Sequence, residues 1–159
     1  MNREPSKKIS AKALTVWRIS GVIKSAIEWS IVATVLFLVH LFDWPNWISI
    51  IMIALGIIFT ILHIFLFPTL RWKQWRYDVR EEEVELQEGI FVLRRTLVPM
   101  IRVQHVDTVQ GPLLRKYQLA SVIIHTAATA HEIPALEMEE AEELRLYISN
   151  LTKVAEEDV

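Results

Sequence analysis

Two long apolar runs dominate the first half of the 159-residue chain. They cover residues 19–42 and 48–67 and are separated by a short polar and aromatic connection. The second run holds 20 residues, which would form about 30 Å of helix and therefore span a bilayer. The first run contains Lys24 and Glu28 near its start, and a spanning helix tolerates both charges if they lie near the lipid headgroups. The pattern predicts two transmembrane helices, over about 22–42 and 48–67.

The connection between the runs has the composition of a tight turn at a membrane surface. It reads Asp43-Trp44-Pro45-Asn46-Trp47, and Trp side chains prefer the membrane interface. The connection has no Lys or Arg, whereas both outer flanks of the hairpin do: Arg3, Lys7, Lys8, Lys12, Arg18 and Lys24 on one side, and Arg71, Lys73, Arg76 and Arg80 on the other. Because basic flanks stay on the cytoplasmic side, we expect a basic lead over residues 1–18, a hairpin over 19–70, and both chain ends in the cytoplasm.

A soluble protein with two buried helices, or a cleaved signal peptide before a single span, would also contain apolar runs. Core helices, however, usually have only about 10–14 apolar residues in a row. No small-residue cleavage site follows the first run, where the sequence reads Val39-His40-Leu41-Phe42. The transmembrane hairpin is therefore the favoured interpretation.

After residue 70 the apolar positions change from helical spacing to alternation, which is typical of half-buried strands. Strands are predicted at 75–80, 84–86, 90–98, 101–109, 119–127 and 130–135. We expect a turn at Glu88-Gly89, a bulge or bend near Gln104-His105, and an end of the fourth strand at Gly111-Pro112. The last strand contains Pro134 and is expected at a sheet edge or terminus. Residues 137–154 carry an apolar stripe at helical spacing. The predicted fold class is α+β: a two-helix transmembrane hairpin, then an antiparallel β-barrel or roll over 71–151 capped by a C-terminal α-helix, then an acidic tail over 152–159.

The net charge of −2 conceals a split between the two halves of the chain. Residues 1–80 carry ten Lys and Arg against four acids, or +6, and the remainder carries seven against fifteen, or −8. An acidic soluble part argues against nucleic-acid binding and against a strongly basic phosphoinositide pocket. The absence of Cys excludes disulfides and thiolate metal sites, which agrees with a reducing cytoplasm.

Five short segments of the soluble half carry a family resemblance. They are Leu97-Val98-Pro99, Arg102-Val103-Gln104-His105-Val106, Gln110-Gly111-Pro112-Leu113-Leu114-Arg115, Leu119-Ala120-Ser121-Val122 and Ile133-Pro134-Ala135-Leu136. In this order they resemble the YdbS-like family of bacterial membrane proteins with a pleckstrin-homology (PH) domain of the second type, over essentially the whole chain. The resemblance implies two spans before a PH-like domain of two antiparallel sheets, no catalytic residue, and relatives encoded beside a larger membrane protein with several such domains. One departure is Gln118, where the family usually has Gly.

No constellation of residues favours an enzyme, a cofactor or a metal. His125 and His131 lie on separate predicted strands with Asp107 and Glu132 elsewhere, and no pair has a spacing such as His-x-x-x-His. Ser121 precedes His125 by four residues but has no nucleophile elbow and no third partner. The four Gly residues are scattered, so the chain has no phosphate-binding loop. We therefore expect a non-enzymatic protein without a metal site.

Small residues recur every four positions in both apolar runs, where they would let helix backbones approach closely. They are Ala26, Ser30 and Thr34 in the first run and Gly56 and Thr60 in the second. At about 100° per residue Glu28 lies nearly opposite Ser30, so we expect Lys24 and Glu28 to face away from the second helix. This face would either dock on a second membrane subunit or contact lipid.

Three polar residues of the resemblance motif, Arg102, Gln104 and His105, are candidates for contacts with a partner. Alternatively, the Gln104 side chain makes hydrogen bonds to backbone groups at the bulge. The favoured function is a scaffold or subunit in a bacterial cytoplasmic-membrane complex with another PH-like membrane protein. Assembly of this chain into a homo-oligomer is also possible. The alternative is a lipid-responsive module in which Arg71, Lys73 and Arg76 grip anionic headgroups.

Overall fold

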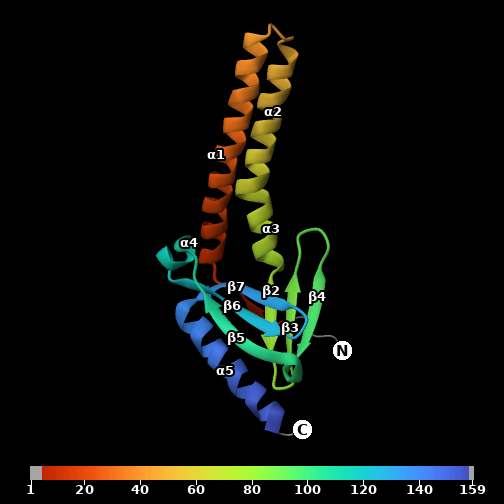
Figure 1. The fold of residues 1–159 in the computed structure, drawn as a ribbon, viewed down its shortest axis with the longest axis vertical. Helices are drawn as coiled ribbons and strands as arrows, with labels where there is room; N and C mark the ends of the chain where they lie inside the picture. Colours follow the sequence, from red (N-terminus) through yellow and green to blue (C-terminus); the bar gives the residue numbers. More distant parts are fainter. Residues whose placement is uncertain (1–4, 158–159) are drawn as a thin grey trace. The chain divides into compact units, whose positions relative to one another are not determined.

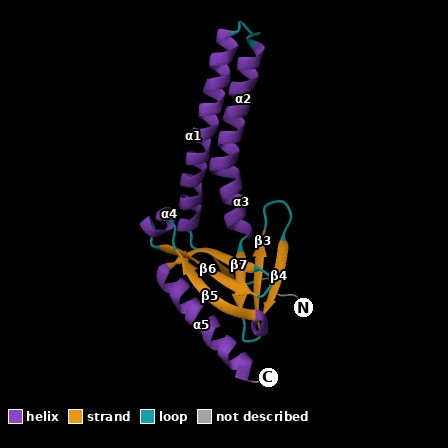
Figure 2. Ribbon diagram, viewed as in Figure 1, coloured by secondary structure: helices purple, strands orange, loops and turns teal. Residues whose placement is uncertain are grey.

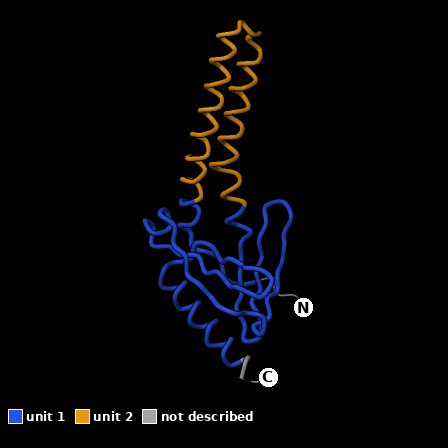
Figure 3. Tube along the Cα trace, viewed as in Figure 1, with its two compact units in different colours: residues 1–16, 71–159 blue, residues 17–70 orange. Residues whose placement is uncertain are grey.

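The computed structural model describes residues 5–157, and the side chains of residues 5–154. The chain divides into two compact units (Figure 3), a hairpin unit of residues 17–70 and a sheet unit of residues 1–16 and 71–159. Arg3 of the expected basic lead and the last residues of the expected acidic tail lie outside the described residues.

The hairpin unit holds the greater part of two long helical segments, which run side by side within it (Figure 1). The first is α1 (Lys12–Leu41), and the second joins α2 (Trp47–Ile61), a π-helical turn η1 (Leu62–Leu66) and α3 (Phe67–Gln74). Both segments are long and apolar enough to cross a membrane, and only 17% and 6% of their most apolar 18-residue windows are buried. Helices in the core of a soluble protein would be mostly covered, so the low burial favours two spans.

Helix α1 begins at Lys12, about ten residues before the expected span. Ser10 explains this early start, because its Oγ accepts a hydrogen bond from the Lys12 amide at 3.2 Å and its carbonyl accepts one from the Ala13 amide at 3.1 Å. A Ser side chain at this position satisfies amides that the first helical turn leaves without partners. The first turn of α1 therefore belongs to the sheet unit, where Ala13 and Val16 are buried.

The sheet unit contains two antiparallel sheets and a long C-terminal helix (Figure 2). The first sheet has the order β1 (Lys7–Lys8), β2 (Arg76–Val79), β3 (Glu83–Glu88) and β4 (Arg94–Pro99), and the second has β5 (Val103–Val109), β6 (Leu119–Thr126) and β7 (Ala130–Glu137). A 3₁₀ turn, η2 (Met100–Arg102), links the sheets, α4 (Pro112–Lys116) links β5 to β6, and α5 (Met138–Glu157) ends the unit. This arrangement confirms the predicted α+β class.

The core of the sheet unit lies among the strands and one face of α5. Its largest fully buried side chains are Trp75, Tyr77, Met100, Leu119, Ile124, Ile133, Leu136 and Ile148. Helix α5 buries Ala141, Leu144 and Ile148 of the predicted apolar stripe, whereas Met138 is exposed. The Tyr77 hydroxyl donates a 2.7 Å hydrogen bond to Glu140, which ties β2 to α5. Burial, followed by this hydrogen bond, raises the pKa of Tyr77 well above its usual range.

The structure confirms the bulge and the edge strand. The β5–β6 register shifts between Val103 and His105, and β7, which contains Pro134, is an edge strand of the second sheet. Gln118, the departure from the family pattern, adopts a positive φ of 55° before β6. Gly tolerates this left-handed conformation more readily than Gln, so the backbone here suits the Gly that the family resemblance implies.

Other elements differ from the expectation. The basic lead is not a separate segment, because Lys7 pairs with Tyr77 in the first sheet and Ile9 is buried. Ile101 lies in the turn η2 instead of a strand. Gly111-Pro112 follows the end of β5 and starts α4, with Pro112 in the first helical turn, where proline's missing N–H leaves no hydrogen bond unmade.

Candidate functional site

The hairpin unit packs through a different face of α1 from the one predicted. Ala26, Ser30 and Thr34 are exposed, and the hydroxyls of Ser30 and Thr34 donate to backbone carbonyls of their own helix at 2.9 Å. The buried positions of α1 in this unit are Gly21, Ser25, Val32 and Val39. Residues repeated every four positions drift around a helix by about 40° per step, whereas the buried set follows the 3.5-residue average that keeps a seam facing its partner. The prediction that α1 packs through Ala26, Ser30 and Thr34 is therefore wrong, and the packing face is the one that contains Gly21, Ser25, Val32 and Val39.

On the second helix, Gly56 and Thr60 both lie against α1. The Trp29 indole Nε1 donates a 2.9 Å hydrogen bond to Thr60 Oγ1. Gly56 is buried, and a Cβ there would lie 3.5 Å from the side chains of Trp29 and Val32. Gly21 is not among the residues singled out from the sequence, yet a Cβ there would lie only 2.5 Å from the His63 carbonyl oxygen. The spacing Gly21-x-x-x-Ser25 is itself a small-residue motif and would have been the signal.

Glu28 lies in the hairpin interior instead of facing outward. Its Oε2 is 3.8 Å from His63 Nδ1, a contact too long for a hydrogen bond, and His63 belongs to the π-helical turn η1. Both atoms are buried and have no hydrogen-bond partner among the side chains and backbone that the structure describes, and the same holds for Ser25 Oγ and Arg18 Nε. Lys24, by contrast, is exposed. The structure therefore separates two charges that were expected to form one docking face, because a 3.5-residue seam includes position 28 but not 24.

The three polar candidates of the sheet unit divide between two places. Arg102 and Gln104 are exposed and line a groove whose other members are Leu97, Val98, Pro99, Ile101, Thr126, Ala127, Ala128, Thr129 and His131. We call this surface the β4 groove. Gln104 lies at the bulge, yet within the described part of the chain its side chain makes no hydrogen bond to backbone groups there. His105 is not among the lining residues of the groove.

His105 instead joins two other side chains on the second sheet. Its ring stacks on that of His125 with centroids 4.3 Å apart and planes 11° from parallel. The Nε2 atoms of His105 and His125 lie 3.6 and 3.3 Å from Oδ2 of Asp107. His131, considered with His125 from the sequence, is elsewhere, with its Nε2 3.0 Å from Thr129 Oγ1. The sequence feature that could have indicated this cluster is His105-x-Asp107, which places two residues of metal-ligand type on one face of a strand.

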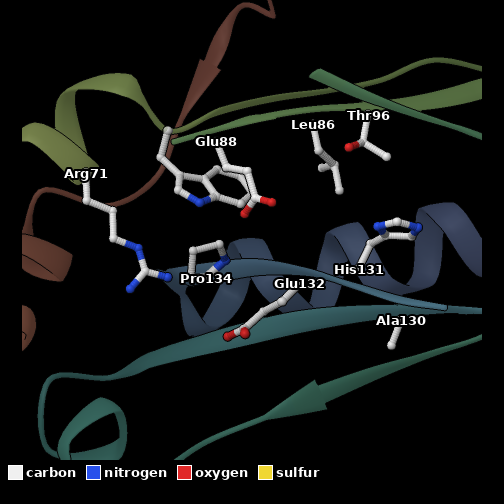
Figure 4. Close-up of a pocket in the computed structure, with 9 residues that line it drawn as sticks. Arg71, Leu86, Glu88, Thr96, Ala130, His131, Glu132 and Pro134 are labelled. Atoms are coloured by element: carbon white, nitrogen blue, oxygen red, sulfur yellow. The ribbon is translucent and has the colours of Figure 1, made fainter. Parts of the chain in front are cut away.

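A pocket between the two sheets is lined by charges of both signs (Figure 4). Leu86, Glu88 and Thr96 of the first sheet face residues 130–134 of β7 across it, and Arg71 extends over one end. Its lining includes one cation, Arg71, and two carboxylates, Glu88 and Glu132. Such a balance does not favour an anionic ligand. Lys73 is exposed and Arg76 is half-buried in β2, and neither lines this pocket.

Glu137 holds the N-terminal segment of the sheet unit. It accepts hydrogen bonds from Lys12 Nζ at 2.9 Å and from Ser10 Oγ at 2.7 Å. The hydrogen bond from Lys12, followed by that from Ser10, lowers the pKa of Glu137. Trp72 Nε1 adds a 3.1 Å hydrogen bond to the Ser10 carbonyl. Ser10 thus caps α1 and anchors it to β7 through one residue.

Comparisons with known proteins agree with this architecture. The family model of the bacterial PH domain matches residues 19–152. The UPF0699 transmembrane protein YdbS of Bacillus subtilis is 52% identical over 159 residues, which cover all of both chains. The UPF0699 transmembrane protein YdbT of the same bacterium is 27% identical over 97 residues, or 58% of this chain and 19% of that one. No solved structure matches. With two apolar helices, two antiparallel sheets and a match over nearly its whole length, the chain belongs to the bacterial PH domain family of transmembrane proteins.

Proposed function

We propose that this protein is a non-enzymatic membrane subunit that presents its PH domain in the cytoplasm and binds another membrane protein with PH-like domains. The observation that carries the proposal is the edge strand β4 beside the exposed β4 groove. The hairpin would hold the domain at the membrane. Both proteins would then diffuse within the membrane plane and not in free solution.

Strand β4 ends the order of the first sheet, so one side of its backbone has no neighbouring strand in the described part of the chain. A free edge is a template for a strand from another chain, with main-chain hydrogen bonds that give affinity. The neighbouring groove supplies apolar surface, because Leu97 is 56% exposed and Ile101 is 61% exposed. An edge and an apolar groove together suit an extended segment of a protein partner.

Polar groups at the groove rim would orient the partner. The Arg102 and Gln104 side chains border the apolar pair and are exposed. Polar rims around an apolar centre are typical of protein–protein interfaces. The Gln104 amide can both donate and accept, which matches a backbone amide of an added strand.

The relatives support a partner of the same kind. YdbT resembles this chain over a stretch that is only 19% of its own length, so it is a much longer transmembrane protein. YdbS and YdbT occur in one bacterium. A short and a long member of one family in one bacterium are candidates to assemble with each other.

The test is co-purification from detergent-solubilised membranes with a co-expressed long family member. Ile101→Glu in the β4 groove should reduce recovery of the partner by about tenfold or more, the effect of losing roughly 1.4 kcal/mol of binding. Leu146→Glu on α5 is the matched control, since Leu146 is also exposed, at 54%, and does not line the groove. Equal recovery with both variants, or recovery of a second copy of this chain in place of the long member, would contradict the proposal.

A second candidate function, lipid sensing, is favoured by the loop between β3 and β4. Phe91 and Val92 at its tip are 81% and 80% exposed, and Arg94 and Arg95 follow them. The loop emerges at the end of the first sheet where β2 begins, because Arg76 pairs with Gln87 and Gln87 with Arg95. An apolar tip with a basic collar suits insertion into an anionic membrane surface.

A single labelled Cys tests this candidate, because the native chain has none. Val92→Cys carries an environment-sensitive dye, and the full-length protein is placed in nanodiscs of neutral or partly anionic lipid. A salt-sensitive blue shift in anionic nanodiscs would favour lipid contact, with Asn150→Cys on α5 as the control position. Identical spectra at both positions in both lipids would exclude it.

A further inference from the structure

The exposed face of the second sheet gathers three side chains of metal-ligand type. Register explains the convergence: His105 pairs with His125 across β5 and β6, and Asp107 lies two residues after His105. Paired residues of an antiparallel sheet, and residues two apart on a strand, point to the same face. The neighbouring paired positions, Val106 with Ile124, point to the other face, where Ile124 is fully buried.

The distances between the potential ligand atoms fit one small metal ion. The ligand atoms of the three residues all lie within 4.8 Å of one another, and the two imidazole Nε2 atoms are 3.6 and 3.3 Å from the same oxygen of Asp107. In a tetrahedral zinc site with bonds of about 2.0–2.2 Å, neighbouring ligand atoms are about 3.3–3.6 Å apart. Small rotations of side chains would therefore bring the three atoms into a single coordination sphere.

We propose that His105, Asp107 and His125 bind a divalent transition-metal ion of the zinc class. Imidazole nitrogen suits zinc, nickel and copper, whereas magnesium and calcium prefer sites built of oxygen ligands only. Three protein ligands leave at least one coordination position for water or for a group from outside the chain. The side chains of the three residues are 59%, 55% and 32% exposed for His105, Asp107 and His125, so that position is open to solvent.

This site is independent of the β4 groove. The lining residues of the groove do not include His105, Asp107 or His125. A bound ion would link two strands that are already paired, so we expect it to alter the fold little. Its main effect would be on which molecules this face of the sheet can bind. A metal-binding test of this site, whatever its result, therefore does not bear on the proposed partner binding.

The experiment titrates Zn²⁺ into the full-length protein in detergent micelles, purified with a tag that contains no His. Isothermal titration calorimetry should show one ion per chain. Binding should weaken in His105→Ala and in His125→Ala by more than the roughly 10–100-fold that loss of a mere supporting residue causes. Co²⁺ should give a visible absorption band in the native protein that both variants lose, and Mg²⁺ should not bind.

The matched control is His131→Ala, which removes a half-buried His of the adjacent strand that contacts Thr129. Its Zn²⁺ affinity should equal that of the native protein. All three variants should unfold at the native temperature without metal, because the substituted side chains are at least partly exposed. Absent Zn²⁺ binding, unchanged affinity in His105→Ala, or an equal loss in His131→Ala would each overturn the proposal.

Discussion

The Trp29 indole donates a hydrogen bond to the Thr60 hydroxyl at 2.9 Å and thereby links the two helices of the hairpin. The same ring covers Gly56, whose missing side chain leaves room for it. An aromatic residue on α1 and two small residues on α2 thus form a single contact. At this level of the hairpin, packing depends on a large residue of α1 fitted against small residues of α2, whereas Gly21 of α1 allows a close backbone approach at the level of His63.

The hydrogen bond can be separated from the ring contact by combining Trp29→Phe, which keeps an aromatic ring but removes the indole N–H, with a change at Thr60. Interhelical hydrogen bonds in membranes contribute on average about 0.6 kcal/mol and at most about 1.7 kcal/mol. We expect a loss of stability within that range, measured by unfolding in detergent mixtures. Thr60→Val should cost a similar amount, and the double variant should cost little more than either. Fully additive losses would show that the hydrogen bond contributes nothing.

The corrected packing face leads to a second prediction, on matched substitutions in α1. Gly21→Val would place a side chain against the His63 carbonyl, and such overpacking costs roughly 1–3 kcal/mol. Ala26→Val adds the same β-branched side chain on the exposed face and should change stability little. Thermal unfolding followed by circular dichroism compares the two. If Ala26→Val were the more damaging, the face first inferred from the four-residue repeat would be the correct one.

These results indicate which features a sequence of this kind can predict. The apolar runs are long enough, and the alternation after residue 70 regular enough, to predict the hairpin and the antiparallel sheets. The packing face of α1 could not be chosen in that way, because small residues occur both at Gly21 and Ser25 and at Ala26 and Ser30. Only the partner helix decides between two such sets.

The pairing of residues that lie far apart in the sequence also could not be predicted. Strand β1 has only Lys7 and Lys8, whose exposed side chains give no alternation to detect. The meeting of His105 with His125 depends on the bulge, since a shift of one residue in register moves a side chain to the opposite face. The bulge was predicted, but its effect on which histidines meet required the register itself.

A third prediction concerns the acid sensitivity of the Glu137 anchor. Since hydrogen bonds from Lys12 and Ser10 lower the pKa of Glu137 in the folded state, its contribution to stability is present above its ordinary pKa of 4.5 and is lost as the pH falls below that value. The ion pair is half exposed, so the contribution is at most about 1 kcal/mol. Glu137→Gln should therefore lose less stability than the native protein between pH 6 and pH 3.5, as measured by thermal unfolding. The same loss in both proteins would contradict this assignment.

The orientation of the hairpin provides the last prediction, and the absence of native Cys makes it direct. Basic residues flank both outer ends, and the connection between α2 and α1 has none, so the connection should lie outside the cytoplasm. We expect Asn46→Cys to react with a membrane-impermeant maleimide in intact spheroplasts, and Asn150→Cys to react only after the membrane is permeabilised. Asn46 and Asn150 are both exposed, so a difference in labelling reports sidedness and not burial. Labelling of Asn150→Cys in intact spheroplasts would place the PH domain outside, where the proposed cytoplasmic complex could not form.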